Sequence, residues 1–91
     1  MLIVWDERKR LANLEKHGLD FEAFETDFDF ETYIAADARP SRTGRHRRVL
    51  IGTFGRTLIV VAVVSPLGSE AVSLVSLRPA SPRERNLFHG T

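Results

Sequence analysis

The sequence predicts an α+β domain in which helices gather around one antiparallel sheet. Three apolar runs follow one another at 47–54, 57–64 and 71–77, and turn-type residues separate them. The separators are too short for a crossover helix, so we expect an antiparallel meander. Helical signals precede and follow these strands, which gives the α+β class. The chain has 91 residues and no cysteine, and we expect one domain over 1–91 without disulfides.

A short strand and a helix are expected first. Residues 3–5 are apolar, and Asp6 can cap the following helix with its carboxylate. Gly18 is typical of the left-handed residue that ends a helix. Within this helix we expect Leu11 and Leu14 to form the apolar face that packs on the core.

Aromatic residues mark a second, short and acidic helix, for which Asp20 is the N-cap. They recur at helical spacing and indicate core packing instead of a ligand cage: Phe21, Phe24 and Phe28. Residues 32–36 fit a strand, and 37–44 contain the proline and glycine of an exposed loop.

The middle strand of the meander is the most apolar one. Its residues 58–64 are apolar on both faces, which indicates a central strand covered on both sides. Turn chemistry at 55–56 and at 65–69 separates it from its neighbours. We therefore expect the core of the domain to lie around this strand.

A capping box predicts a C-terminal helix. Ser81 and Glu84 stand three residues apart, and Pro82 occupies the first helical position between them. The helix is expected to run toward Phe88.

Charge is divided unevenly along the chain. Residues 1–37 hold ten acidic and four basic side chains, whereas 38–91 hold nine arginines and two acidic residues. A guanidinium grips phosphate oxygens in pairs and keeps its charge, so one interpretation is a phosphate-bearing partner. The other is that the two halves neutralise each other inside the fold, and composition does not decide between them.

The meander is expected to separate the arginines into two patches. The start of its first strand and the end of its third should lie at opposite ends of the sheet, about 23 Å apart for seven residues. The arginines from Arg42 to Arg48, among them Arg47, then form one patch, and the other lies around Arg78. A turn and the last helix add three cations near Arg78: Arg56, Arg83 and Arg85.

Short motifs along the chain together resemble the BrnT family of toxins from bacterial type II toxin–antitoxin pairs. Their order and spacing match over nearly the whole chain: Trp5-Asp6, Asn13 with Lys16-His17-Gly18, Phe21 with Phe28, Arg47 with Gly52, and Ser76-Leu77-Arg78-Pro79-Ala80 with Glu84. The resemblance implies a RelE-like fold with a short N-terminal strand, two helices, an antiparallel sheet and a C-terminal helix. This agrees with the elements expected from the residues themselves.

For function, the resemblance implies a small endoribonuclease that needs no metal or cofactor and inhibits translation by cleaving RNA. It also implies a BrnA-type antitoxin as protein partner, in a complex that represses its own operon and contacts operator DNA through the antitoxin. The first residues lack the basic start of a signal peptide, so we expect a cytoplasmic protein with no membrane partner. The residues leave two other functions open, a non-catalytic nucleic-acid-binding regulator and a protein-interaction module.

Two positions depart from the pattern of the family. The family often has a glutamate before the arginine that opens the strand, and this chain has His46 there. It often has a tyrosine near the C-terminus, where this chain has Phe88 and His89. Either His46 replaces the glutamate as a base, or neither position belongs to the chemistry.

Metal-free RNA cleavage needs a proton carrier as well as cations, because arginine cannot be deprotonated in proteins. His17 is the first candidate, since imidazole titrates near neutral pH, and the alternative is that it caps a helix end. Asn13, one turn earlier, is expected to orient His17. Lys16 is expected either to stabilise phosphate charge or to complement the helix dipole.

Arg78 completes the predicted catalytic set with His17 and Lys16, because it closes a strand just before a helix begins. The alternative for Arg78 is a structural ion pair with Glu84. The residues expected to contact RNA are Arg47, Arg48, Arg56, Ser76, Arg83 and Arg85. We expect no metal site, because the chain has three separated histidines and no cysteine.

Overall fold

The computed structural model describes residues 2–38, 42 and 44–90. Along the chain the elements are β1 (Leu2–Trp5), α1 (Glu7–His17), the 3-10 turn η1 (Phe21–Ala23), α2 (Phe24–Asp27), β2 (Ile34–Asp37), β3 (Arg48–Phe54), β4 (Leu58–Leu67), β5 (Ala71–Pro79) and α3 (Pro82–His89). This confirms the α+β class. In the described part of the chain, no helix has the length and apolar character needed to cross a membrane.

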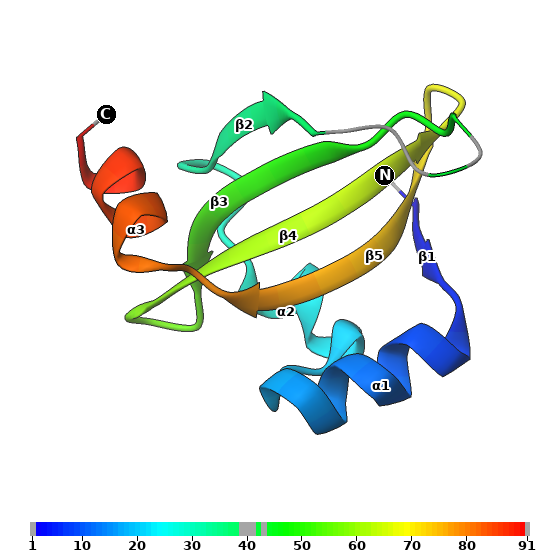
Figure 1. Cartoon of the computed structure of the whole chain (residues 1–91), viewed down its shortest axis with the longest axis horizontal. Coiled ribbons are helices and arrows are strands. Elements are labelled where there is room, and N and C mark those ends of the chain that lie inside the picture. The colour runs from blue at the N-terminus through cyan, green and yellow to red at the C-terminus, as the bar shows by residue number, and fades with distance from the viewer. Residues whose placement is uncertain (1, 39–41, 43, 91) are drawn as a thin grey trace.

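The sheet has five strands in the order β1-β5-β4-β3-β2 (Figure 1). The antiparallel meander β3-β4-β5 is confirmed, and β2 extends it by pairing antiparallel with β3. At the other edge, β1 pairs with β5 in parallel, with Leu2 opposite Ala71 and Trp5 opposite Leu74. The sequence predicted β1 but not its partner, because a four-residue apolar run carries no information about the strand beside it.

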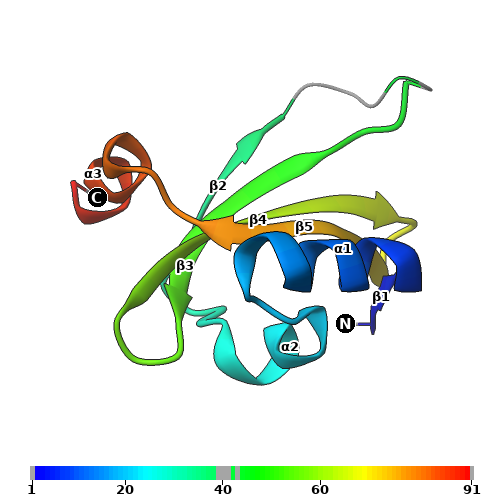
Figure 2. The same cartoon turned by 60° about the horizontal axis from the view of Figure 1, so that its bottom comes forward.

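One face of the sheet, which we call the α1 face, is covered by α1 and α2 (Figure 2). Alternate residues of β4 on this face are fully or nearly buried: Val60, Ala62 and Val64. The predicted aromatic stripe packs on them and is confirmed as core, with Phe21, Phe24 and Phe28 at most 4% exposed. A Cβ on Gly52 would lie 2.8 Å from Cζ of Phe28, so the aromatic layer rests directly on the β3 backbone.

The opposite face, which we call the α3 face, has a smaller apolar cluster. Ile51, Ile59 and Val61 are buried there, and Phe88 of α3 packs against them. The predicted capping box is confirmed, because the Ser81 hydroxyl accepts from the Glu84 N–H while the Glu84 carboxylate accepts from the Ser81 N–H. The start of α3 is therefore fixed beside the end of β5.

The apolar face expected for α1 was wrong, although its ends were right. Asp6 caps α1 and Gly18 ends it with φ 71°, as predicted. Leu11 and Leu14, however, are 53% and 37% exposed, and the buried residue of α1 is Asn13. The reason lies in the sheet, because β1 pairs with β5 only as far as Leu74 and leaves later backbone groups of β5 without a strand partner.

Asn13 takes the place of that missing strand. Its side-chain Nδ2 donates to the carbonyl of Leu77 at 2.7 Å, and its Oδ1 accepts from the Leu77 N–H at 3.1 Å. Nδ2 also donates to the carbonyl of Leu19 at 3.0 Å. Buried backbone groups need such partners, so the helix turns an amide instead of a leucine toward the strand edge.

The second turn of the meander is shorter than predicted. Residues 65–67 belong to β4, and the turn follows at 68–70, where Gly68 has φ 68°. Pro66 is tolerated in the strand because the pairing with β3 ends at Val64, so this section of β4 has β5 as its paired neighbour. The expected loop at 37–44 begins after Asp37, which ends β2, and 39–41 and 43 lie outside the described residues.

The pairing of β4 with β5 contains one irregularity. Val63 is opposite Ser76, but the next residue of β4, Val64, is opposite Leu74. Val75 therefore has no opposite residue in β4, which is the arrangement of a β-bulge.

Candidate functional site

The α3 face brings together three of the residues predicted to form the site. Side chains alternate along a strand, so Arg47 lies on the same face as Val49, and Arg78 lies on the face of Val61, which it pairs with. Ser76, two residues before Arg78, shares this face. All three side chains are partly exposed.

Arg47 and Arg78 are closer together than expected. The register places Arg78 opposite Val61 and Val61 opposite Ile51, which is four residues along β3 from Arg47. This corresponds to about 13 Å along the strands and about 10 Å across two strand spacings, or about 16 Å in all. The expected 23 Å was wrong because β5 does not end level with the far end of β3.

Arg78 forms a two-pronged ion pair with Glu84. Nη1 donates to Oε1 at 2.7 Å and Nη2 donates to Oε2 at 2.8 Å. The hydrogen bonds from Arg78 and, to a smaller extent, from the N–H of Ser81 lower the pKa of Glu84 to about 2, against the effect of burial. Glu84 in turn raises the pKa of Arg78. The ion pair that the sequence left as an alternative is thus present, on the face that carries Arg47 and Ser76.

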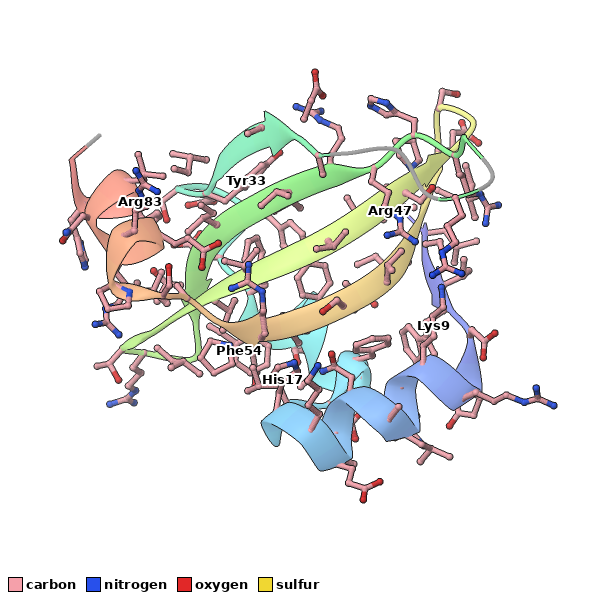
Figure 3. All side chains as sticks on the ribbon, in the orientation of Figure 1. Lys9, His17, Tyr33, Arg47, Phe54 and Arg83 are labelled. Atoms are coloured by element: carbon pink, nitrogen blue, oxygen red, sulfur yellow. The ribbon has the colours of Figure 1, made fainter. Side chains whose placement is uncertain are left out.

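Arg47 lies at the other end of the α3 face (Figure 3). Its Nε is buried and has no hydrogen-bond partner among the described residues. Just before it, the carbonyl of His46 accepts a hydrogen bond from the Ser65 hydroxyl at 2.8 Å, which ties this segment to β4. Arg47 therefore combines a fixed backbone with a donor that no described group satisfies.

The cations predicted around Arg78 are exposed. Arg83 and Arg85 lie on α3, and Arg56 lies in the turn between β3 and β4. Within the described residues, these three form no ion pair. The turn and the start of α3 lie at the same end of the sheet, as predicted (Figure 1).

Arg48 does not join this group. It pairs with Val64, so alternation places its side chain toward the α1 face, and its Nε lies 3.9 Å from a carboxylate oxygen of Asp37. His46 lies 3.7 Å from the same Asp37 oxygen. His46 and Arg48 form a separate exposed group at the start of β3.

The described ion pairs fall mostly within each half of the chain. In the first half, Arg10 pairs with Glu7 and with Asp20. The pKa of Asp20 is lowered by a hydrogen bond from the backbone N–H of Glu22 and by another from the side chain of Arg10. In the second half, Arg78 pairs with Glu84. The loose contacts at Asp37 link the two halves. Of these ion pairs, the one between Arg48 and Asp37 is the contact that joins an arginine of the second half to a carboxylate of the first half.

His17 and Lys16 lie on α1, which covers the opposite face of the sheet. Figure 3 shows His17 at the C-terminal end of α1, beside the end of β5. The expectation that Asn13 orients His17 was wrong, because the Asn13 amide is occupied by Leu19 and Leu77. Lys16 is exposed. The structure thus does not collect His17, Lys16 and Arg78 on one face.

One feature of the site escaped the sequence reasoning. The buried role of Asn13 had no local signal, because its partner Leu77 lies in a distant strand. The Arg78–Glu84 pair, which the sequence left as an alternative, did have a local signal, since the capping box places Glu84 in the first turn of α3, just after the end of β5. Among the described residues, no cluster of three or more histidine, aspartate or glutamate side chains could hold a metal ion.

Fold and site define a small α+β protein with one face closed by helices and aromatic residues and the other carrying arginines. Residues 5–84 match the family model described as the ribonuclease toxin BrnT of type II toxin–antitoxin systems. The 1.1 Å crystal structure of the Brucella abortus ribonuclease toxin BrnT is similar, with 38% identity and a TM-score of 0.73. The match covers 89% of this chain and 97% of that one. A comparison with curated proteins found no match. The chain belongs to the BrnT family of ribonuclease toxins.

Proposed function

We propose that this toxin is a metal-independent endoribonuclease that binds RNA on the α3 face and inhibits translation by cleaving it. The observation that carries the proposal is the pair of partly exposed arginines on this face, Arg47 and Arg78, about 16 Å apart. With Cα atoms at this separation, two long arginine side chains on one face can contact phosphates a few nucleotides apart on one strand. Arg83 and Arg85 on α3 and Arg56 in the adjacent turn extend the positive surface.

Arginine stabilises the charge that develops on the phosphate during attack by the 2′-hydroxyl. Proton transfer needs another group, and His17 is our candidate. Asn13 contacts Leu77, and His17 lies one helical turn further, about 6 Å along the helix axis, toward the strand end that carries Arg78. RNA that crosses the edge of β5 would meet His17 and Lys16 after leaving the α3 face.

We further propose a BrnA-type antitoxin as the protein partner, acting in the cytoplasm. Covering the α3 face would neutralise the toxin, because this face carries the arginines proposed to hold RNA. Operator DNA would then be contacted by the antitoxin within an autorepressing complex.

The direct test is RNA cleavage by the purified toxin in EDTA. We expect cleavage in the chelator and a loss of at least about 100-fold on Arg78→Ala, as for removal of one charge-stabilising donor. Circular dichroism should show that the variant remains folded, and Glu15→Ala on the exposed side of α1 serves as the matched control. Cleavage that stops in EDTA would contradict metal independence, and undiminished cleavage by Arg78→Ala would remove Arg78 from the site.

His17 lies on α1, on the other side of the sheet from Arg78, and this favours one alternative, an RNA-binding regulator without catalysis. With three to five phosphate contacts to single-stranded RNA, log K should fall with log salt at a slope of about −2 to −3.5 for either function. Such a slope without cleavage products on a gel would favour the regulator.

A further inference from the structure

The ion pair with Glu84 uses only one edge of the Arg78 guanidinium. Its contacts are Nη1 to Oε1 and Nη2 to Oε2, with a longer one from Nη1 to the carbonyl of Pro79 at 3.4 Å. Nε–H and the second hydrogen of Nη2 have no partner among the described residues. These two donors lie in the guanidinium plane along its other edge and form a second fork. The side chain of Arg78 is 36% exposed, so this fork is open to a ligand.

Glu84 is itself held firmly. Besides the two bonds from Arg78, its Oε1 accepts from the N–H of Ser81 at 2.8 Å. Its own backbone N–H donates to the Ser81 hydroxyl at 3.2 Å, and Pro82 fixes the first helical turn. The carboxylate therefore belongs to the rigid start of α3 and not to a mobile surface chain.

We propose that Glu84 is a positioning residue, which holds Arg78 so that its free Nε–Nη2 edge binds one RNA phosphate side-on. The inference rests on the proposed function and adds to it the atoms that make the contact. Glu84 touches Arg78 and not the RNA, so it acts through the arginine.

Positioning of this kind matters because a free arginine loses rotamer entropy when it binds, and a misplaced one binds in the wrong geometry. The Arg78–Glu84 fork removes that freedom before RNA arrives, and a phosphate then meets two parallel donors. The low pKa of Glu84, about 2, keeps the fork intact across the neutral range. Lysine, which is a point charge, could not present two donors in one plane.

The test is Glu84→Gln, because glutamine can still take part in a capping box but cannot accept both prongs of the arginine. We expect kcat for RNA cleavage to fall about 10- to 100-fold, as for a misplaced catalytic group, while KM stays within about twofold. Asn86→Ala is the matched control, because Asn86 is exposed on the same helix and its loss leaves Ser81, Glu84 and the ion pair in place. It should cleave at the wild-type rate. Equal or faster cleavage by Glu84→Gln would overturn the inference, since Glu84 would then merely compete with the phosphate.

A double-mutant cycle separates positioning from a general structural role. In an Arg78→Ala background, Glu84→Gln should cause no further loss of kcat, because Glu84 acts only through Arg78. A further loss equal to that seen in the wild type would contradict the inference.

A spectroscopic experiment tests the free edge without relying on cleavage. The Arg78 Nε–H resonance, assigned by its absence in Arg78→Lys, should shift on adding a 2′-O-methyl RNA oligonucleotide, which lacks the attacking hydroxyl. The Nη resonances, slowed by the Glu84 fork, should persist in the complex. A shift in a protein that cleaves no RNA would refute the proposed function but support this inference. An Nε–H resonance that RNA does not move would refute the inference even if the protein cleaves.

Discussion

The two faces of the sheet are built on opposite principles. On the α1 face, phenylalanine and valine side chains fill the space under two helices, and polar groups such as Asn13 enter only with all their hydrogen bonds made. On the α3 face, a small apolar cluster lies beneath α3, and Arg47, Ser76 and Arg78 lie on the same face. One five-stranded sheet thus carries the larger apolar core on one side and, on the other, the arginines that we propose bind RNA.

Removing an aromatic side chain from the α1 face should have the largest effect on stability. Phe24 is 1% exposed and contacts the rings of Phe28 and Phe30. We expect Phe24→Ala to lower the free energy of unfolding by about 3–5 kcal/mol, from lost burial and the cavity left behind. Urea denaturation followed by circular dichroism measures this. Leu87→Ala on α3, where the side chain is 57% exposed, should cost less than about 1 kcal/mol. Similar losses for the two variants would break the contrast between the faces.

Asn13 gives the next largest effect, because it is the polar member of the closed face. Asn13→Ala should lower the free energy of unfolding by about 2–4 kcal/mol, because it leaves the buried N–H and carbonyl of Leu77 without a hydrogen-bond partner. The same denaturation experiment applies, with Leu11→Ala as control, because that leucine lies on the solvent side of the same helix. A loss no greater than that of the control would mean that water replaces the amide at the strand edge.

The Arg78–Glu84 pair should contribute the smallest term, and its contribution should depend on pH. Because the folded-state pKa of Glu84 is depressed from 4.5 to about 2, the stability it provides is present above pH 4.5 and is lost as the pH falls toward 2. Glu84→Gln should therefore unfold about 1–2 kcal/mol more easily than wild type at pH 7, and this gap should close in acid. Denaturation at a series of pH values measures the gap. A gap that stays constant down to pH 2 would contradict the ionised pair.

Local chemistry determined most elements that the sequence predicted correctly. Asp6, Asp20 and Ser81 cap their helices through bonds to backbone N–H groups two or three residues away, so the neighbouring residues suffice to predict them. The same holds for the turn at 55–56, where Gly55 has φ 69°. The aromatic stripe was equally readable, because its spacing is the period of a helix.

The features that could not be predicted depend on distant partners. The inward face of α1 is decided by unpaired groups of Leu77, which is 64 residues from Asn13. The separation of Arg47 from Arg78 is decided by strand register, which the sequence does not display. For the site, the sequence was enough to name the residue types and to offer the Arg78–Glu84 ion pair as an alternative. That His17 lies on the other side of the sheet from Arg78 could be learned only from the fold.

Val75, which has no opposite residue in β4, resets the in-and-out count of β5. Were the strand regular beyond Leu74, Leu77 would point toward solvent and Arg78 would be driven in among the phenylalanines. Deletion of Val75 alone would thus exchange the two faces for the side chains that follow it in β5, whereas deletion of two residues would leave each of them on its present face. The bulge at Val75 therefore determines that Leu77 faces the α1 side of the sheet and Arg78 the α3 side.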